Sequence, residues 1–431
     1  MMKLRTGLMS MMAAGTAALA AAPAAAAGFF LQEQSVKASG RAFAGEAAMA
    51  DDVSVMFYNP AGMTHLDGAQ AAAGLYAIMP KARVSDTGTS AAIGPFTGIP
   101  VGGLAEEQGF SPQPAGYLYA AMPVSDALWM GLAVTVPFGL KDDYKDDYWG
   151  RYDSTKSEVM VVEIAPTIAY QITPQVSLGA NIGFQRSTAK LISAIPNPLD
   201  PSGPSAASDG SFAVDGDDWS IGFTLGVLVK ASERMRIGIS YRSAVDHRLK
   251  GEARTDFLGS VTEQDVAADL NLPEVISAAV AYDVTPTVTL LGQVNYYGWD
   301  RFAEIRLELE DGSELVSAEN FRNTWGVSLG VQVKATEDWT LRSGIEYDET
   351  PTIDEFRSTR IPDADRLWLA VGASYNVTDH LTIDLSYVHM FKKTEPINRT
   401  NPFPLLATTV ETVGSTDTSS NVVGVGVRGR F

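Results

Sequence analysis

Cysteine is absent from this chain of 431 residues. The chain therefore has no disulfide, no thiolate nucleophile and no thiolate metal site. No uninterrupted apolar run after the first 26 residues is long enough for a membrane helix, which excludes a helical membrane protein. Positive charge is scarce, because 32 Lys and Arg stand against 51 Asp and Glu. This balance excludes a nucleic-acid partner, since binding phosphates needs a basic surface.

Residues 1–26 have the features of a secretory signal peptide. Lys3 and Arg5 precede an uncharged run rich in Leu, Met and Ala, which ends in Ala24-Ala25-Ala26. A basic start, an apolar middle and a small-residue cleavage site predict export, with cleavage near Ala26. The alternative is a membrane-anchoring helix, which the Ala and Gly content and the A-x-A ending disfavour. Loss of the two cations changes the formal charge from −19 to about −21.

Alternating apolar and polar residues mark strands through the rest of the chain. The final segment, NVVGVGVRGRF, places three valines on one face and Arg428 and Arg430 on the other. Alternation of this kind fits a soluble sandwich or an outer-membrane barrel. Long strands, aromatic residues near strand ends and the aromatic terminus Phe431 favour the barrel.

Short turns between alternating segments predict the number of strands. Six similar turns begin at Met122, Tyr170, Val229, Tyr282, Val333 and Tyr375. Longer and more polar connections lie between them. In bacterial barrels the short turns and both termini are periplasmic, so six turns imply fourteen strands. We therefore predict an all-β fold, a 14-stranded antiparallel transmembrane barrel over residues 70–431.

Residues 27–69 are the only sizeable part of the predicted mature chain outside the strand pattern. They include GRAFAGEAAMADDVSVMFYNPAGM, which is rich in small residues and carboxylates. A barrel of fourteen strands is wider than its own side chains fill. We predict that residues 27–69 form a hatch in the lumen, with Asp51 and Asp52 available to pair with luminal charges. Asn59-Pro60 ends the hatch before the first strand.

At this point the sequence resembles the FadL family of outer-membrane transporters of long-chain fatty acids and other hydrophobic compounds. The segment AGFFLQEQSVKASGRAFAGEAAMADDVSVMFYNPAGM is very similar to the N-terminal hatch of that family, including its Asn59-Pro60-Ala61 motif. LNLPEVISAAVAYDV, WTLRSGIEYDETP and RIPDADRLWLAVGASYNV resemble its later strands and loops. The resemblance runs from the cleavage site to Phe431.

The resemblance implies a monomer that takes up hydrophobic molecules without an energy source or a cofactor. The implied partners are a long-chain fatty acid or another hydrophobic small molecule, outer-membrane lipid and lipopolysaccharide, and the outer-membrane assembly machinery. A ligand lands on an apolar groove of the outer loops and passes to a deeper luminal pocket. It then leaves sideways through a gap at a kink in the third strand once the hatch moves.

The groove is expected in the loops at residues 193–217 and 250–271. The first loop contains several prolines and cannot form a long helix. The second loop is predicted to form a short helix with an apolar stripe. The groove residues on it are Phe257, Leu258, Val261 and Val266. The alternative is a solvated surface loop whose apolar residues pack on each other.

The deeper pocket is expected to contain a cation, because an unpaired buried carboxylate is costly. Arg186, Lys190 and Arg322 are the candidates, because they lie toward the outer half of the predicted barrel. The alternative is that these cations pair with luminal carboxylates.

The resemblance also assigns residues to the tip of the hatch. Phe29, Phe30 and Leu31 match the apolar N-terminal tip that the family inserts into its ligand pocket.

The third strand and the hatch supply candidate gating residues. In MGLAVTVPFGL, residues 130–140, Gly131 and Gly139 weaken strand pairing and Pro137 cannot donate to the ladder. For Pro137 itself we expect only that it ends the strand at the outer rim. The other candidates are in the hatch: Asp51, Asp52, Asn59, Pro60 and Ala61.

The sequence gives weaker support to a calcium site, to an enzyme and to other kinds of channel than to transport of fatty acids. The acidic run KDDYKDDYWGRYD suits calcium in composition but fits no known loop motif, so a solvated outer loop is favoured and no metal site is predicted. A lipid hydrolase needs a nucleophile and a base within reach, and no motif supports one around His389 or the three other histidines. A channel for monoaromatic hydrocarbons and a general diffusion porin remain as alternatives.

Overall fold

The structure is a computed structural model that describes residues 28–431. The predicted signal peptide and Ala27 lie outside the described residues. Over residues 28–431, fourteen strands close into an antiparallel barrel, because the last strand pairs with the first along its whole length. The strands of the wall are β1 (Gln70–Asp86), β5 (Gln113–Pro123), β6 (Leu128–Asp143), β7 (Lys156–Thr173), β8 (Val176–Ile195), β9 (Gly210–Ser232), β10 (Met235–Arg242), β13 (Val275–Thr285), β14 (Val288–Tyr297), β17 (Thr324–Lys334), β18 (Trp339–Asp348), β19 (Arg366–Thr378), β20 (Leu381–Lys392) and β22 (Thr408–Arg430).

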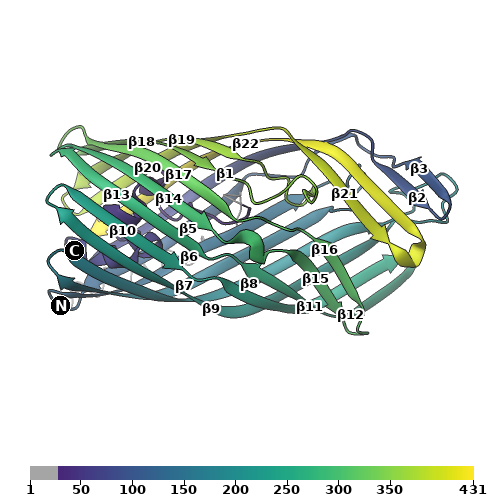
Figure 1. The fold of residues 1–431 in the computed structure, drawn as a ribbon, viewed down its shortest axis with the longest axis horizontal. Coiled ribbons are helices and arrows are strands. Elements are labelled where there is room, and N and C mark those ends of the chain that lie inside the picture. Colours follow the sequence, from purple (N-terminus) through teal and green to yellow (C-terminus); the bar gives the residue numbers. More distant parts are fainter. Residues whose placement is uncertain (1–27) are drawn as a thin grey trace.

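Eight additional strands of the described chain extend the wall at the end opposite the C-terminus (Figure 1). They are β2 (Ser90–Ile93), β3 (Phe96–Pro100), β4 (Glu106–Gln108), β11 (Val245–Phe257), β12 (Ser260–Leu272), β15 (Glu304–Leu309), β16 (Glu314–Ala318) and β21 (Glu395–Phe403). Two 3-10 turns lie in the connections: η2 (Trp299–Arg301) and η3 (Pro404–Leu406). The predicted fourteen-stranded barrel is confirmed, with its six short turns at one end and its long connections at the other.

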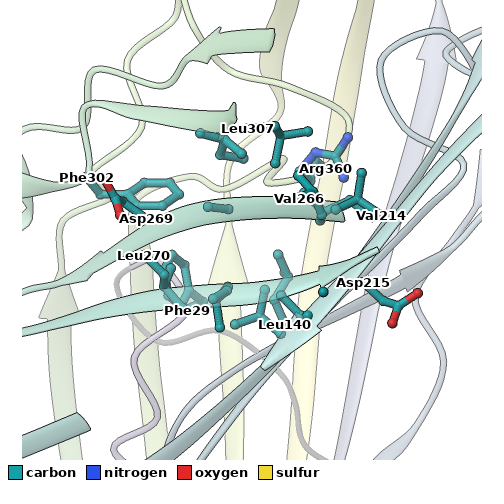
Figure 2. A pocket seen from close by; sticks show the side chains of 18 of the residues that line it. Phe29, Leu140, Val214, Asp215, Val266, Asp269, Leu270, Phe302, Leu307 and Arg360 are labelled. Carbon is teal, nitrogen blue, oxygen red and sulfur yellow. The ribbon is translucent and has the colours of Figure 1, made fainter. Parts of the chain in front are cut away.

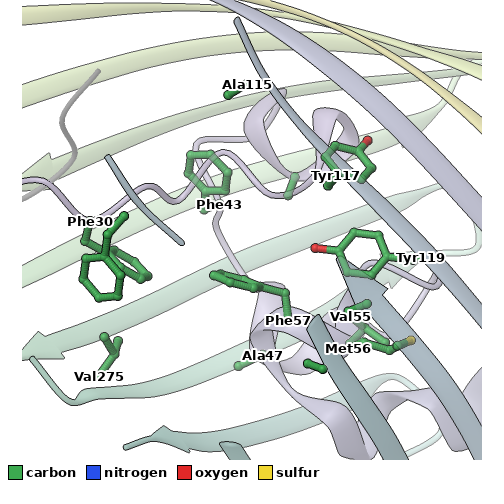
Figure 3. Packing of buried hydrophobic residues seen from close by; sticks show 14 of the residues in the cluster. Phe30, Phe43, Ala47, Val55, Met56, Phe57, Ala115, Tyr117, Tyr119 and Val275 are labelled. Atoms are coloured by element: carbon green, nitrogen blue, oxygen red, sulfur yellow. The ribbon is translucent and has the colours of Figure 1, made fainter. Parts of the chain in front are cut away.

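Residues 28–69 are buried inside the barrel and contain only short helices. These are α2 (Val36–Ser39), α3 (Glu46–Met49), α4 (Val55–Tyr58) and the 3-10 turn η1 (Pro60–His65). Figure 3 shows Phe43 and Phe57 of this segment among wall residues such as Tyr119 and Val275. Small residues bring the segment against the wall: a methyl group at Gly40 would lie 2.8 Å from the backbone of Gly372. We call residues 28–69 the hatch.

Apolar and polar side chains alternate along the wall strands between the outer surface and the lumen, as an outer-membrane barrel requires. In β8, Leu178, Ile182 and Phe184 are exposed on the outer surface, whereas Asn181 and Gln185 between them are buried in the lumen. The apolar face therefore points outward and the polar face inward, the reverse of a soluble sandwich. Within residues 28–431 no helix is long and apolar enough to span a membrane.

Two sequence-based expectations about the outer loops were wrong. Residues 245–272 form the β11–β12 hairpin and not a helix, since β11 pairs with β9 and β12 with β15. The acidic run at residues 141–153 is solvated only at its exposed charged residues Asp143, Lys145, Asp146 and Asp147. Its aromatic residues Tyr144, Tyr148 and Trp149 are buried, because the run folds into the outer mouth of the barrel.

Candidate functional site

The wall is interrupted at the third barrel strand, β6. β5 pairs with β6 only up to Leu118 and Val134. Beyond that point β6 bulges between Thr135 and Phe138 where it pairs with β7, and it continues to Asp143. Pro137 lies within this bulge, so the expectation that it ends the strand at the rim was wrong. Since a proline cannot donate to the ladder, its place at a bulge with one free edge is physically consistent.

The hatch tip occupies the edge of β6 that β5 leaves free. The amide of Leu31 donates to the carbonyl of Pro137 at 2.8 Å, and the amide of Gly139 donates to the carbonyl of Phe29 at 2.9 Å. The side-chain amide of Gln34 donates to the Val136 carbonyl at 2.7 Å. Phe30 and Phe138 form an isolated antiparallel bridge between these hydrogen bonds. The tip therefore acts as a short extra strand that seals the wall.

An apolar chamber lies on the outer side of this seal (Figure 2). With the hatch closed, its cavity volume is about 60 Å³, and it is partly open toward solvent. Phe29 forms its inner end and packs edge-on against Trp299 and Phe302, with ring centroids at 4.9 and 5.4 Å. The remaining apolar lining comes from strands β6 to β15 and from the loop before β19: Leu140, Val159, Ala189, Leu191, Val214, Leu249, Val266, Ala268, Leu270, Ile305, Leu307 and Ile361.

Arg360 is the one cation that lines this chamber within residues 28–431. Its guanidinium donates to the Ser157 hydroxyl at 2.8 Å and to the Asp153 carbonyl at 2.9 Å. It forms no salt bridge with a described carboxylate, although its charge also acts on Asp142 and Glu319. Two carboxylates, Asp215 and Asp269, line the same chamber. The sequence reasoning missed Arg360, although it is the first residue of the RIPDAD segment that carries the family resemblance.

The three predicted pocket cations lie elsewhere. Arg186 and Lys190 are on the outer surface of β8, and Arg186 pairs there with Asp217 at 3.6 Å. Arg322 precedes β17 at the outer rim, where it is half-exposed and lies 3.9 Å from Asp365. The expected luminal placement was therefore wrong. Arg186 shares its strand face with Leu178, Ile182 and Phe184, and this period of two is the signal that places it outside.

The predicted groove residues divide between the hairpin tip and the chamber. Leu258 and Val261 are exposed at the tip of the β11–β12 hairpin, and Phe257 is half-buried beside them. Val266 is buried and lines the chamber. A cluster that contains Val214, Val266 and Leu307 continues outward to the half-buried Phe212 and Leu309. Apolar residues therefore connect the chamber to the outer rim.

The charged residues of the hatch pair mostly with one another. Lys37 contacts Asp51 at 2.6 Å and Asp52 at 3.1 Å, and Arg41 contacts Glu46 at 2.5 Å. Burial alone would raise the pKa of Asp51, but Lys37 and Arg41 outweigh it and hold the pKa well below its usual range. The wall partner of this network is Gln332 on β17, which contacts Arg41 and Asp51. Asp51 and Asp52 therefore form their ion pairs with cations of the hatch itself, in place of the luminal wall charges that the sequence predicted.

Asn59 joins the hatch to a different part of the wall. Its side-chain amide donates to the Ala47 carbonyl at 2.6 Å and to the Val227 carbonyl on β9 at 3.0 Å, and its side-chain oxygen caps the Pro60–His65 turn by accepting from Ala61. A methyl group at Gly226 would lie 2.0 Å from that oxygen, so the close contact depends on a glycine. Gly131 on β6 similarly faces Met56 of the hatch. These contacts hold the closed hatch in place.

Glu33 is a buried carboxylate next to the tip. Its side chain is 1 % exposed, and neither oxygen has a hydrogen-bond partner among the described residues. Burial raises the pKa of Glu33 to about 7. The backbone amides of Glu33 and Gln32 and the charge of Arg366 lower this pKa less than burial raises it, and Asp348 raises it further. The protonation state of Glu33 thus depends on its burial in the hatch and on the charges of its neighbours.

The outer mouth is closed by two inward-folded loops, residues 144–155 and 349–365. The Asp153 carboxylate accepts from the amide and hydroxyl of Thr359 at 2.6 and 2.7 Å. The hydroxyl groups of Tyr144 and Tyr148 also donate to Thr359. Within residues 28–431 no cluster of His, Asp or Glu side chains has the geometry to hold a metal ion. The acidic run therefore contributes hydrogen bonds that lock the mouth.

The chain matches one protein family over residues 17–431, described as "Outer membrane protein transport protein (OMPP1/FadL/TodX)". Outer membrane protein P1 of Haemophilus influenzae is 31% identical over 402 residues, which cover 86% of this chain and 87% of that protein. The long-chain fatty acid transport protein of Escherichia coli is 28% identical over 412 residues, which cover 86% and 89%. Among solved structures, a Pseudomonas aeruginosa FadL homologue superposes with a TM-score of 0.85 at 23% identity and covers 94% of this chain and 100% of that chain.

The family match spans nearly the whole chain and agrees with the barrel fold. The match confirms the predicted location in the outer membrane. It also confirms that the protein is a transport channel for hydrophobic molecules and not a hydrolase. The chain belongs to the OMPP1/FadL/TodX family of outer-membrane transport proteins.

Proposed function

We propose that this protein carries long-chain fatty acids, or molecules of similar shape, passively across the outer membrane. The observation that carries the proposal is the apolar chamber, which has Phe29 of the hatch at its inner end and Arg360 as its cation. An acyl chain fits the apolar walls, and a carboxylate beside Arg360 gains a charge-assisted hydrogen bond. The molecule class is thus amphiphilic, with a long apolar part and an anionic head.

The proposed path follows the apolar residues of the structure. Capture occurs at the exposed Leu258 and Val261 of the β11–β12 hairpin, from which the apolar cluster leads inward to the chamber. Binding there competes with Phe29 for the same space. If the tip leaves β6, the edge between β5 and β6 opens sideways, because no wall strand pairs with Val136 to Gly139 on that side. Lateral exit through this opening completes the path.

Uptake into proteoliposomes tests this function. Palmitate and hexadecanol have the same chain length but differ in charge, and both should enter through the wild-type protein. Arg360→Gln should weaken equilibrium binding of palmitate by about tenfold or more and leave hexadecanol nearly unchanged, since a hydrogen bond to a charged group contributes about 1.5–3 kcal/mol. Lys334→Gln, outside the chamber, is the matched control. Steady ion conductance through the wild type would indicate a diffusion porin instead.

A channel for monoaromatic hydrocarbons is the second candidate, and the aromatic inner end of the chamber favours it. Phe29 contacts Trp299, Phe302 and Phe138 with ring centroids between 4.9 and 6.0 Å. Aromatic rings prefer such edge-on partners. Toluene that binds more tightly than hexadecanol and is insensitive to Arg360→Gln would establish this alternative.

We infer that the barrel functions as a monomer in contact with outer-membrane lipid and lipopolysaccharide. A closed barrel leaves no strand edge that a second copy must cover, which supports the monomer. Arg186 and Lys190 on the outer surface support contact with lipopolysaccharide phosphates. Mass measurement of the detergent-extracted protein with its bound lipid tests both points.

A further inference from the structure

A second cavity lies directly behind the hatch tip. Its volume is about 30 Å³ with the hatch closed, and β9, β10, β13 and β14 line it mainly with polar side chains. Phe29 lines the apolar chamber, and the next residue, Phe30, lines this polar chamber. Movement of the tip therefore changes the wall of both cavities at once.

Arg242 on β10 is the only charged residue that lines the polar chamber within residues 28–431. It donates two hydrogen bonds to the Glu163 carboxylate, at 2.7 and 3.0 Å. Its guanidinium also lies over the ring of Phe57 of the hatch, 4.4 Å from the ring centroid. A guanidinium has five N–H donors, so Glu163 leaves part of the group free to bind a second acceptor.

The position of this ion pair relates it to the interrupted wall. Glu163 on β7 is the register partner of Thr135, the last residue of β6 before the bulge. Thr224 also lines the chamber, is 1 % exposed, and has a hydroxyl without a partner among the described residues. An unsatisfied buried hydroxyl beside a cation is a ready partner for an incoming oxygen atom.

We propose that the polar chamber is a second, inner carboxylate site, in which Arg242 binds the head of the ligand after the tip moves. This inference rests on the proposed function. The ligand head would leave Arg360, pass the displaced Phe30 and meet Arg242 beside the bulge, while its acyl chain faces the open edge of β6. The Thr224 hydroxyl can donate to the same carboxylate.

Glu163 makes this site weak enough to release its ligand. Its carboxylate already offsets the charge of Arg242, so a second carboxylate binds to a nearly neutral pair. Conduction needs each site to bind well enough to accept a ligand but not well enough to retain it. Removal of the Glu163 charge should therefore tighten the inner site, and removal of both charges should abolish its preference for an anion.

Equilibrium binding of palmitate and hexadecanol to the detergent-solubilised protein tests the proposal in an Arg360→Gln background, which removes the outer cation. Glu163→Gln should bind palmitate about tenfold or more tightly than the Arg242→Gln/Glu163→Gln double variant, with the parent between them. Hexadecanol affinity should be the same in all three. Arg236→Gln, on the same strand but outside the chamber, should match the parent. Heat-modifiable migration on gels verifies that each barrel is folded.

The outcomes separate the inner site from the function. If the wild type takes up neither palmitate nor hexadecanol, the proposed function fails and the inner site fails with it. If the wild type takes up both but Glu163→Gln weakens palmitate as much as the double variant does, the ion pair is only structural and the inner site is overturned. Equal changes for palmitate and hexadecanol would overturn it in the same way.

Discussion

The amide of Gly139 on the third barrel strand donates a hydrogen bond to the carbonyl of Phe29 in the hatch, at 2.9 Å. With the bond from Leu31 to Pro137, it makes the hatch tip part of the barrel wall. The tip also forms the inner end of the apolar chamber. One short segment therefore fills the ligand site and closes the lateral opening, so ligand binding and opening are physically coupled.

Deletion of Phe29 to Glu33 should leave an assembled barrel and raise palmitate affinity, because the tip competes with the ligand for the chamber. The fourteen strands pair along closed ladders, and the deleted residues contribute two backbone hydrogen bonds to β6 and local packing. Heat-modifiable migration measures assembly, and equilibrium binding of palmitate measures the site. A deletion variant that fails to fold would show that the tip is required for the wall itself.

Asn59→Ala should fold normally and change palmitate uptake. The substitution removes the bonds to Ala47 and Val227, and each lost bond typically costs about 0.5–1.5 kcal/mol. Such a loss shifts a two-state hatch by roughly two- to tenfold but does not unfold a barrel. Uptake per folded barrel is the measurement. Asn376→Ala, which loses two exposed side-chain bonds near the end of β19, to Glu337 and Thr382, should leave uptake unchanged.

In a purely structural role for Asn59, the yield of folded protein would fall and uptake per folded barrel would stay constant. That result would remove the gating role.

Docking of the hatch tip should weaken as pH rises from about 5 to about 7. Glu33 has an ordinary pKa of 4.5 in water and about 7 when buried. The docked state therefore binds the proton of Glu33 more tightly than the undocked state does. The proton's contribution to the stability of docking is fully present below the ordinary pKa of Glu33 and is lost as pH rises through about 7. The docking constant should fall by up to about tenfold per pH unit in this window. Palmitate affinity, which depends on displacement of the tip, should rise accordingly.

Glu33→Gln should flatten this pH dependence while the tip stays docked. The charged and titratable groups that act on Glu33 are Arg366 and Asp348 on the facing strands, with Glu346 and Tyr297 beside them. An unchanged pH profile in Glu33→Gln would assign the dependence to one of these neighbours.

Phe431→Ala should slow assembly in the outer membrane without destabilising the assembled barrel. The ring of Phe431 is 44 % exposed, and its backbone amide donates to the Ala69 carbonyl at 2.8 Å, which the substitution retains. The assembly machinery is expected to recognise an aromatic end on the last strand. Pulse-chase measurement of heat-modifiable protein tests this, and normal kinetics would contradict it.

The sequence was sufficient for the barrel because a strand pattern is local. The period of two and the six turns together specified fourteen strands without reference to distant contacts. The β11–β12 hairpin was mistaken for a helix because its apolar residues, such as Leu258 and Val266, have spacings that suit either element. Pairing of this segment with β9 and β15 makes it a hairpin. A local residue pattern does not predict pairing between distant segments.

The site was less predictable for the same reason. Arg360 belongs to a loop that folds into the mouth, where Asp153 and Ser157 position it from another part of the chain. Similarly, Tyr148 and Trp149 were expected in a solvated outer loop but are buried by contacts with distant parts of the chain. Arg186 differs from these residues, because the alternation along β8 is a local signal that predicts an outward-facing side chain. The luminal prediction for Arg186 overlooked that signal.

A reversible cross-link between the hatch tip and the third strand tests the coupling most directly. Phe30 and Phe138 are bridge partners that face each other between two hydrogen bonds, a pair geometry with short separation that suits a disulfide. The chain has no other cysteine, so Phe30→Cys/Phe138→Cys introduces only the intended bond. Each single variant controls for the loss of a ring.

Palmitate uptake by this double variant should be abolished when the disulfide is formed and restored when it is reduced, in the same preparation of folded barrels. The two single variants should respond to neither treatment. Suppose instead that the variant with a fully formed disulfide takes up palmitate as fast as the same variant after reduction of the disulfide. The ligand would then cross without displacement of the tip, which would contradict the proposed coupling of ligand site and lateral opening.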